Sequence, residues 1–232
     1  MTKKLMLIFL LALGIASTAA LTGCGSAAAY RLAGVHNDET LTDAQTNYNK
    51  ARTEAAAKLA DTAKAGTEML KAAQQAQDHP QEQATTNVED AADGYATSVD
   101  KAERQREVYA DGLAQLREEV QAAKDRWSEV VGKIGDETLK NEEQRRMDRR
   151  LRSLERKLQA AERGLSAYDT ALSRAKDARL VAASLKEDLA LGKIGDRIDE
   201  FSGQVKQANA ELVRAADLLL ANLTVDEPAA GS

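Results

Sequence analysis

The sequence has few of the residues that build β-sheet cores, disulfides or metal sites. Aromatic residues make up only 3% of its 232 residues, and there are two prolines, two histidines and one cysteine. With so few large rings and β-branched runs, a β-sandwich or a doubly wound sheet would lack its usual core and strand residues. The single cysteine excludes an internal disulfide and a thiolate zinc cluster. Alanine, leucine and charged residues dominate instead, which favours an all-α protein.

Residues with catalytic chemistry are also scarce. His36 precedes the helical patterns and His79 lies beside Pro80, and neither has partners at metal-ligand spacing. Acidic residues are abundant, but on helices this highly charged they usually form the solvated face. We therefore predict a protein that is not an enzyme, with no catalytic residues, no metal and no cofactor.

The first residues have the pattern of an export signal. Lys3 and Lys4 precede an apolar run over residues 5–15, which is shorter than the about 20 residues that usually span a bilayer. Leu21 to Cys24 then reads Leu-Thr-Gly-Cys, which resembles the lipobox of bacterial lipoproteins. This resemblance implies cleavage before Cys24 and acylation of its thiol, so that acyl chains bind the protein to a membrane. The alternative is an ordinary secretory signal with a chance cysteine.

The residues after Cys24 suggest where the protein would be held. Gly25 follows the cysteine, whereas aspartate is the usual retention signal of inner-membrane lipoproteins; the resemblance thus favours the outer membrane if the host has two, with the protein facing the periplasm. Residues 24–37 are small and polar and predict a flexible tether of about 45 Å when extended. Without Lys3 and Lys4, 30 of the 32 basic residues remain against 37 acidic ones, a net charge of −7. This charge argues against a nucleic-acid partner.

Three segments carry apolar residues spaced alternately four and three apart, which keeps one seam of each helix facing a partner. Short links between them force neighbouring helices antiparallel, so residues 80–223 predict an elongated three-helix bundle of the spectrin type, followed by a disordered tail over 224–232. The seams run through Val99, Ala102, Tyr109, Leu113, Leu116, Val120, Ala123, Trp127, Val130 and Ile134; through Met147, Leu151, Leu154, Leu158, Ala161, Leu165, Tyr168, Leu172 and Ala175; and through Ile194, Ile198, Phe201, Val205, Ala208, Leu212, Ala215 and Leu219.

Two turns are expected between these helices. Gly132 to Asp136 offers glycines for a turn and an acid to cap the next helix. The apolar pattern of the second seam changes phase near Leu180 to Ser184, which predicts a second bend there, with Ser184 as the cap of the next helix. The pentapeptide Gly-Lys-Ile-Gly-Asp occurs at residues 132–136 and again at 192–196, and two similar hinge points explain it better than an internal duplication.

Two arginines lie in phase with the apolar seams. Arg106 interrupts the first seam, and Arg179 continues the second. A charge at such a position is unfavourable unless it reaches solvent or a carboxylate. We expect both arginines to fix helix register.

An additional helix is predicted over residues 38–78. Its stripe is mostly alanine and shifts phase after Ala55, so it buries little apolar surface per turn. We expect it to pack weakly, as a fourth helix of the bundle. Its open seam is one candidate site for a partner helix or for self-assembly into a longer coiled coil.

A basic cluster on the second seam helix is the strongest candidate binding surface. Arg145, Arg149, Arg152 and Arg156, here called the arginine stripe, fall at outward heptad positions. Such a stripe suits an anionic partner, such as a lipid head group, a lipopolysaccharide phosphate or an acidic protein. The alternative is a solvated face relieved by nearby acids, for example Asp148 four residues before Arg152.

The Arg126-Trp127 pair leading to Glu129, the basic stretch 144–158 and the loop-helix pattern of 185–198 carry a family resemblance. Through them, residues 109–212 resemble an uncharacterised family of helical bacterial envelope proteins. The resemblance implies a fold more than a function. Together these patterns predict a lipid-anchored envelope protein acting as a spacer, scaffold or interaction module. Binding of an anionic envelope component and self-assembly are the alternatives.

Overall fold

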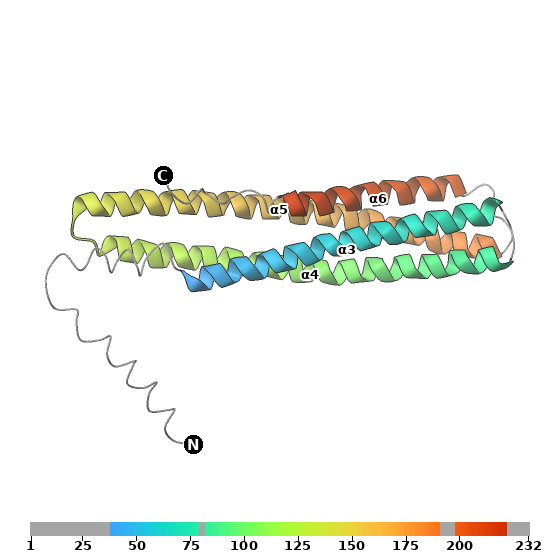
Figure 1. Ribbon diagram of the computed structural model, residues 1–232, viewed down its shortest axis with the longest axis horizontal. Helices are drawn as coiled ribbons and strands as arrows, with labels where there is room; N and C mark the ends of the chain where they lie inside the picture. Colours follow the sequence, from blue (N-terminus) through green and yellow to red (C-terminus); the bar gives the residue numbers. More distant parts are fainter. Residues whose placement is uncertain (1–37, 79–81, 191–197, 222–232) are drawn as a thin grey trace, which may run out of the picture.

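The protein is an all-helical rod. The computed structural model describes residues 38–78, 82–190 and 198–221, which form four helices: α3 (Glu39–Asp78), α4 (Glu82–Gly132), α5 (Glu137–Ala190) and α6 (Ile198–Ala221). Successive helices run antiparallel; α3 and α5 each pack against both α4 and α6 (Figure 1). The longest helix, α5, has 54 residues and is therefore about 80 Å long at about 1.5 Å per residue.

The turn between α4 and α5 confirms the prediction for residues 132–136. α4 ends at Gly132 and α5 begins at Glu137. Asp136 caps α5, since its Oδ1 accepts a hydrogen bond of 2.9 Å from the amide of Leu139. This acid satisfies one of the amides that a helix start leaves without a partner.

The bend predicted near Leu180 to Ser184 is wrong, because α5 continues without interruption to Ala190. Leu180 is 71% exposed, while Ala178, Ala182 and Leu185 around it are buried, so the buried face of α5 runs through the predicted bend. The apparent phase change therefore comes from one outward-facing leucine. The link to α6 and the second copy of the pentapeptide lie outside the described residues.

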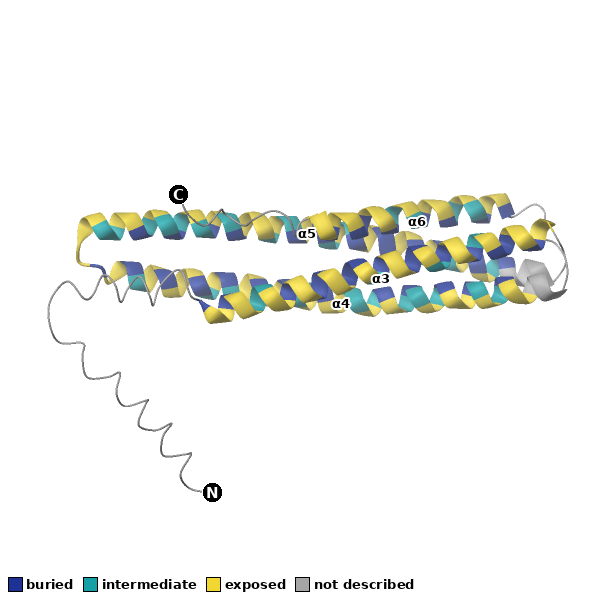
Figure 2. Cartoon of the chain, viewed as in Figure 1, coloured by how far each residue is buried: buried dark blue, intermediate teal, exposed yellow. Residues whose placement is uncertain are grey.

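The N-terminal helix α3 is a full member of the bundle and packs more closely than its alanine content suggested. Leu41, Leu59 and Met69 are completely buried, and Figure 2 shows the buried residues as a stripe along the helix. Small residues allow this packing, since Gly66 of α3 lies directly against the side chain of Asn209 on α6. Because the α3 stripe faces the core, it is not the open seam that was considered for self-assembly.

Both predicted seam arginines pair with a carboxylate on the facing helix. The Nε and Nη2 atoms of Arg106 donate to the two oxygens of Asp169 at 2.8 and 3.1 Å. The Nη1 atom of Arg179 donates to Asp100 at 2.5 Å. These side chains remain partly exposed, so each pair is worth about 0–1 kcal/mol. That the pairs fix the register of α4 against α5 stays a prediction.

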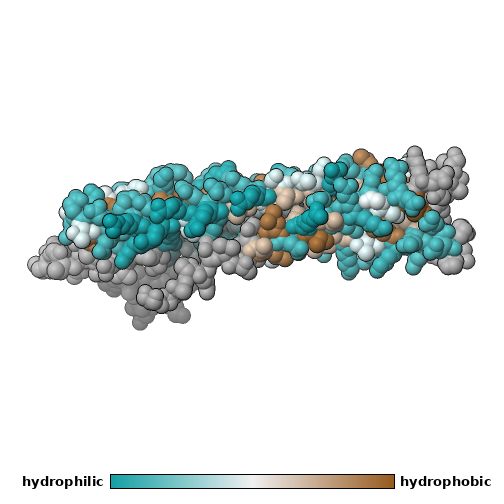
Figure 3. Space-filling model, turned by 90° about the horizontal axis from the view of Figure 1, so that it is seen from above, coloured by the Kyte–Doolittle hydropathy of each residue, from teal (hydrophilic) through white to brown (hydrophobic). Residues whose placement is uncertain are grey.

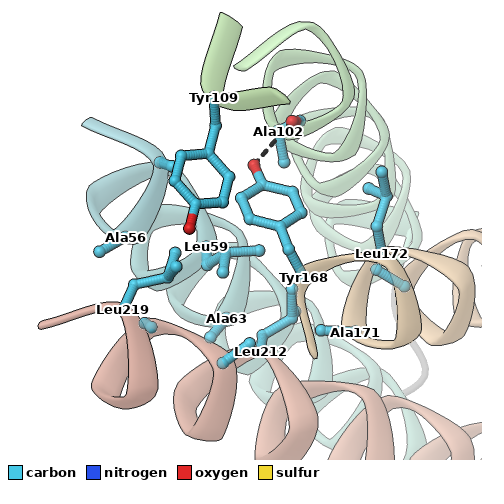
Figure 4. Close-up of a cluster of buried hydrophobic side chains, with 14 of the residues drawn as sticks. Ala56, Leu59, Ala63, Ala102, Tyr109, Tyr168, Ala171, Leu172, Leu212 and Leu219 are labelled. Carbon is cyan, nitrogen blue, oxygen red and sulfur yellow. Dashed lines mark hydrogen bonds between the residues drawn. The ribbon is translucent and has the colours of Figure 1, made fainter. Parts of the chain in front are cut away.

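Buried tyrosines join three helices in the middle of the rod. The hydroxyl groups of Tyr48 and Tyr109 are 3.1 Å apart, and Tyr109 also donates to the carbonyl of Ala161. Tyr168 donates to the carbonyl of Ala102 at 2.7 Å, and Figure 4 shows its ring beside that of Tyr109 among buried leucines and alanines. Burial raises the pKa of all three tyrosines, so the hydroxyl groups stay protonated.

The helices differ in length, and this divides the rod into three parts (Figure 1). Four helices pack together from the end where α3 is followed by α4 to the point where α6 ends at Ala221. Three helices continue through the middle of the rod. Beyond Asp38, where α3 begins, the α4–α5 hairpin extends alone.

Candidate functional site

The predicted lipidation residue, Cys24, lies outside the described residues, and the described chain begins at Asp38. The Oδ1 atom of Asp38 caps α3 by accepting a 3.2 Å hydrogen bond from the Leu41 amide. Arg126 of α4 donates to both oxygens of Asp38 at 2.8 Å and to Glu119 at 2.5 Å. The start of α3, where the predicted tether joins the rod, is therefore tied to α4.

This ion cluster stays charged at neutral pH. Burial raises the pKa of Asp38, but hydrogen bonds from Arg126, Thr40 and the Leu41 amide outweigh that effect, and the pKa lies below its usual value. Hydrogen bonds from Thr40 and Arg126 also lower the pKa of Glu119. The two carboxylates in turn raise the pKa of Arg126.

The arginine stripe lies on the outward face of α5. All four arginines are exposed, and Arg149, Arg152 and Arg156 line a shallow hollow together with Glu155 and Gln159. Asp148, the acid expected to relieve Arg152, instead accepts a 2.9 Å hydrogen bond from Gln144. Within residues 38–78, 82–190 and 198–221, no carboxylate forms an ion pair with Arg145, Arg149 or Arg152. Their charges are thus open to an external anion.

Arg150, a neighbour of the arginine stripe on α5, contacts α4 instead of facing solvent. The guanidinium of Arg150 lies 4.9 Å from the ring centre of Trp127, a cation–π contact between α5 and α4. Trp127 is 2% exposed, as expected for a seam residue. Burial lowers the pKa of Arg150. This arginine therefore contributes to the packing of α5 against α4, while the arginines of the stripe face solvent.

A groove that the sequence did not indicate lies on the described surface. It has a volume of about 520 Å³ and lies beside the end of α6, between α3 and α5. Leu116, Val120 and Leu154 provide apolar lining, whereas Arg156, Lys157 and Arg163 of α5 bring positive charge to it. Figure 3 shows apolar side chains gathered on one face near the middle of the rod.

One buried arginine of α3 also lines this groove. Arg52 is only 5% exposed, and its guanidinium carbon lies 5.5 Å from the ring centre of Tyr48. Its Nε atom has no hydrogen-bond partner, and in the described part of the chain no carboxylate forms an ion pair with it. A buried guanidinium normally pairs with an acceptor, because desolvating an unpaired charge is unfavourable. The groove is therefore suited to a carboxylate or another anion.

Sequence reasoning missed the groove because its lining comes from three helices. The only local signal was Arg52 itself, a charged residue beside the alanine seam of α3. Its charge relates to Arg156 and Lys157 only after α3 and α5 have packed at a particular register.

Comparisons with known proteins add nothing to this geometry: no family model, curated protein or solved structure matches the chain. The resemblances to lipoproteins and to an uncharacterised envelope family remain predictions from the sequence. Among the described residues, no three His, Cys, Asp or Glu side chains are grouped so as to hold a metal ion. None of the four described helices is long and apolar enough to cross a membrane.

Proposed function

We propose that this protein is a lipid-anchored, non-enzymatic spacer or scaffold of the bacterial cell envelope. The observation that supports this proposal is the position of Asp38, the residue that precedes α3, on the rod. Asp38, fourteen residues after Cys24, is fixed to α4 by Arg126, near the hairpin end of the rod. A rod tethered there would present its opposite end away from the lipid.

The dimensions support such a role. The tether reaches about 45 Å when extended, and α5 adds about 80 Å. A force on the tether would act on the Asp38–Arg126 contact and on the buried residues of α3, because the start of this helix is fixed to α4. A rigid rod with one end held at a membrane can set a distance or display a partner site.

Intact-mass spectrometry of the protein from membranes of its host tests the anchor, with Cys24→Ala as the comparison. The expected mature chain begins at residue 24 and carries acyl mass, and the variant carries none. An unmodified chain that fractionates with soluble proteins in both cases would refute the anchored spacer.

A second function is supported by the position of the arginine stripe. The stripe lies on the part of α5 that pairs with the end of α4, toward the end of the rod at which α3 begins (Figure 1). Tethering by Cys24 would hold these exposed charges near phosphate-bearing head groups, where each basic residue is worth about 1 kcal/mol. We propose that the stripe binds these phosphates and orients the rod on the lipid surface.

Cosedimentation of the Cys24→Ala chain with vesicles tests this second function. Binding is expected to vesicles with phosphatidylglycerol but not to purely zwitterionic ones, and to weaken at high salt because the charges are screened. Vesicles with lipopolysaccharide distinguish that source of phosphate from phospholipid.

The decisive variant changes Arg145, Arg149 and Arg152 together to Gln. Its matched control changes three exposed basic residues elsewhere on the rod, Lys50, Lys71 and Arg174, to Gln. Loss of binding in the first variant alone supports the stripe. Equal loss in both would show an unspecific charge effect and refute it.

A further inference from the structure

The groove beside α6 is the place that one more stretch of the fourth helix would occupy. α3, α4 and α5 continue past the point at which α6 ends, and the groove lies between α3 and α5 at that point. We propose that residues 222–227 of this chain extend α6 into the groove, where Asp226 and Glu227 pair with its basic side chains.

The register of the bundle brings these acids to the correct level. Leu219 of α6 lies against Gly164 of α5, and the two helices are antiparallel. Asp226 follows Leu219 by about two helical turns, and Lys157 precedes Gly164 by about two turns, each a distance of about 11 Å. An extended α6 therefore places Asp226 level with Lys157, and Glu227 level with Arg156.

The contact with α3 leads to the same arrangement. Asn209 lies against Gly66, so residues farther along α6 meet residues farther back along α3. Figure 4 accordingly shows Leu219 near Ala56. Arg52 lies about one turn before Ala56 on α3, at the level that residue 223 would reach on α6. A glutamate or aspartate one turn beyond residue 223 is within reach of the long side chain of Arg52.

Charge and burial explain why this segment fits. The groove brings together Arg52, Arg156, Lys157 and Arg163, and the Arg52 Nε has no described hydrogen-bond partner. Two adjacent carboxylates would reduce the unfavourable burial of the Arg52 charge. Leu223, four residues after Leu219, falls on the face by which α6 packs and would cover the apolar floor.

The length of the segment matches the groove. Pro228 cannot continue a helix, because it lacks an amide hydrogen and its ring clashes with the preceding turn. A helix extended from Ala221 therefore ends by about residue 227, after about 9 Å. That length suffices to bring both acids to the basic side chains.

Hydrogen–deuterium exchange of the full Cys24→Ala chain tests the proposal without any lipid. Amides of residues 223–227 are expected to exchange at least about tenfold more slowly than in an unstructured peptide. The combined change Asp226→Asn with Glu227→Gln should remove most of that protection, and so should Arg156→Gln with Arg163→Gln. The matched control, Asp177→Asn with Asp217→Asn, neutralises two exposed acids outside the groove and should leave it intact.

Three results would overturn the proposal. Exchange at unstructured rates in the unmodified chain would leave the groove to an external acidic partner. Protection that survives both neutralising variants would show that charge pairing does not hold the segment. Protection that grows with protein concentration would identify a second copy as the occupant. Arg156 belongs to both the stripe and the groove, but the exchange experiment contains no lipid and the stripe variant leaves Arg156 unchanged. The proposed function is therefore tested separately.

Discussion

Replacing Gly164 by alanine tests how closely α6 approaches α5. In an exposed helix interior, alanine is favoured over glycine by about 1 kcal/mol. At Gly164, however, an added β-carbon would lie 2.9 Å from Leu219 Cδ2 and 3.0 Å from the Tyr109 hydroxyl. Both neighbours are completely buried, and Tyr109 is held by its hydrogen bond to Ala161.

The net effect follows from these two opposing terms. Carbon atoms normally pack about 3.5–4.0 Å apart, and relieving a buried overlap of this kind costs about 1–3 kcal/mol. Subtracting the gain in helix propensity, we expect Gly164→Ala to lower the free energy of unfolding by about 0–2 kcal/mol. Gly94 has nothing within 4 Å of a β-carbon, so Gly94→Ala should instead raise it by about 1 kcal/mol.

Urea unfolding followed by circular dichroism on the Cys24→Ala chain measures both changes, with equal m-values as the check that the same surface unfolds. A double-mutant cycle that combines Gly164→Ala with Leu219→Ala should show a coupling energy of about 0.5–3 kcal/mol. If Gly164→Ala stabilised the protein as much as Gly94→Ala and showed no coupling to Leu219, the packing of α6 against α5 would be refuted.

Two further predictions concern polar contacts. Because the pKa of Asp38 is lower in the folded than in the unfolded protein, its contribution to stability is present above the unfolded pKa of about 3.9 and is lost as pH falls through the folded pKa. When unfolding is measured from pH 7 to pH 3, the free energy of unfolding should therefore fall less steeply in Asp38→Asn than in the unmodified protein. An unchanged pH profile would contradict the Arg126 contact. Tyr168→Phe removes the hydrogen bond to the Ala102 carbonyl and should lower the free energy of unfolding by about 0.5–1.5 kcal/mol. An unchanged free energy of unfolding in the same urea assay would show that this bond contributes nothing.

The success and failure of the sequence predictions have a common physical basis. The turn at Gly132 and the Asp136 cap depend on residues within a few positions of each other, and the structure confirms them. Most of the predicted seam residues are buried, but Val131 takes the place of Val130 in the core, and Ile194 lies outside the described residues. The bend at Leu180 was wrong because an exposed leucine was interpreted as a break in the helix, although Ala178 and Ala182 on either side of it are buried. In an alanine-rich helix, small core residues are easily overlooked beside a large one at the surface.

The extent of packing in α3 illustrates the limit of local patterns. Its alanine stripe predicted a weak association, because alanine buries little area. In the bundle, the same small residues let α3 approach α6 so closely that Gly66 touches Asn209, and Leu41, Leu59 and Met69 become completely buried. Whether a small residue weakens or tightens a helix contact depends on the surface that faces it.

The sequence alone determined the helical class, the antiparallel hairpin of α4 and α5, the outward face of the arginine stripe and the expected place of the anchor. Each follows from helical periodicity or from a short motif, which act over one or a few turns. Only the tertiary structure decided where α3 begins and α6 ends along the rod, and hence that Asp38 meets Arg126 and that Arg52 shares a groove with Arg156. These pairs are separated by about a hundred residues, and their meeting depends on register set by non-local contacts such as Gly164 with Leu219.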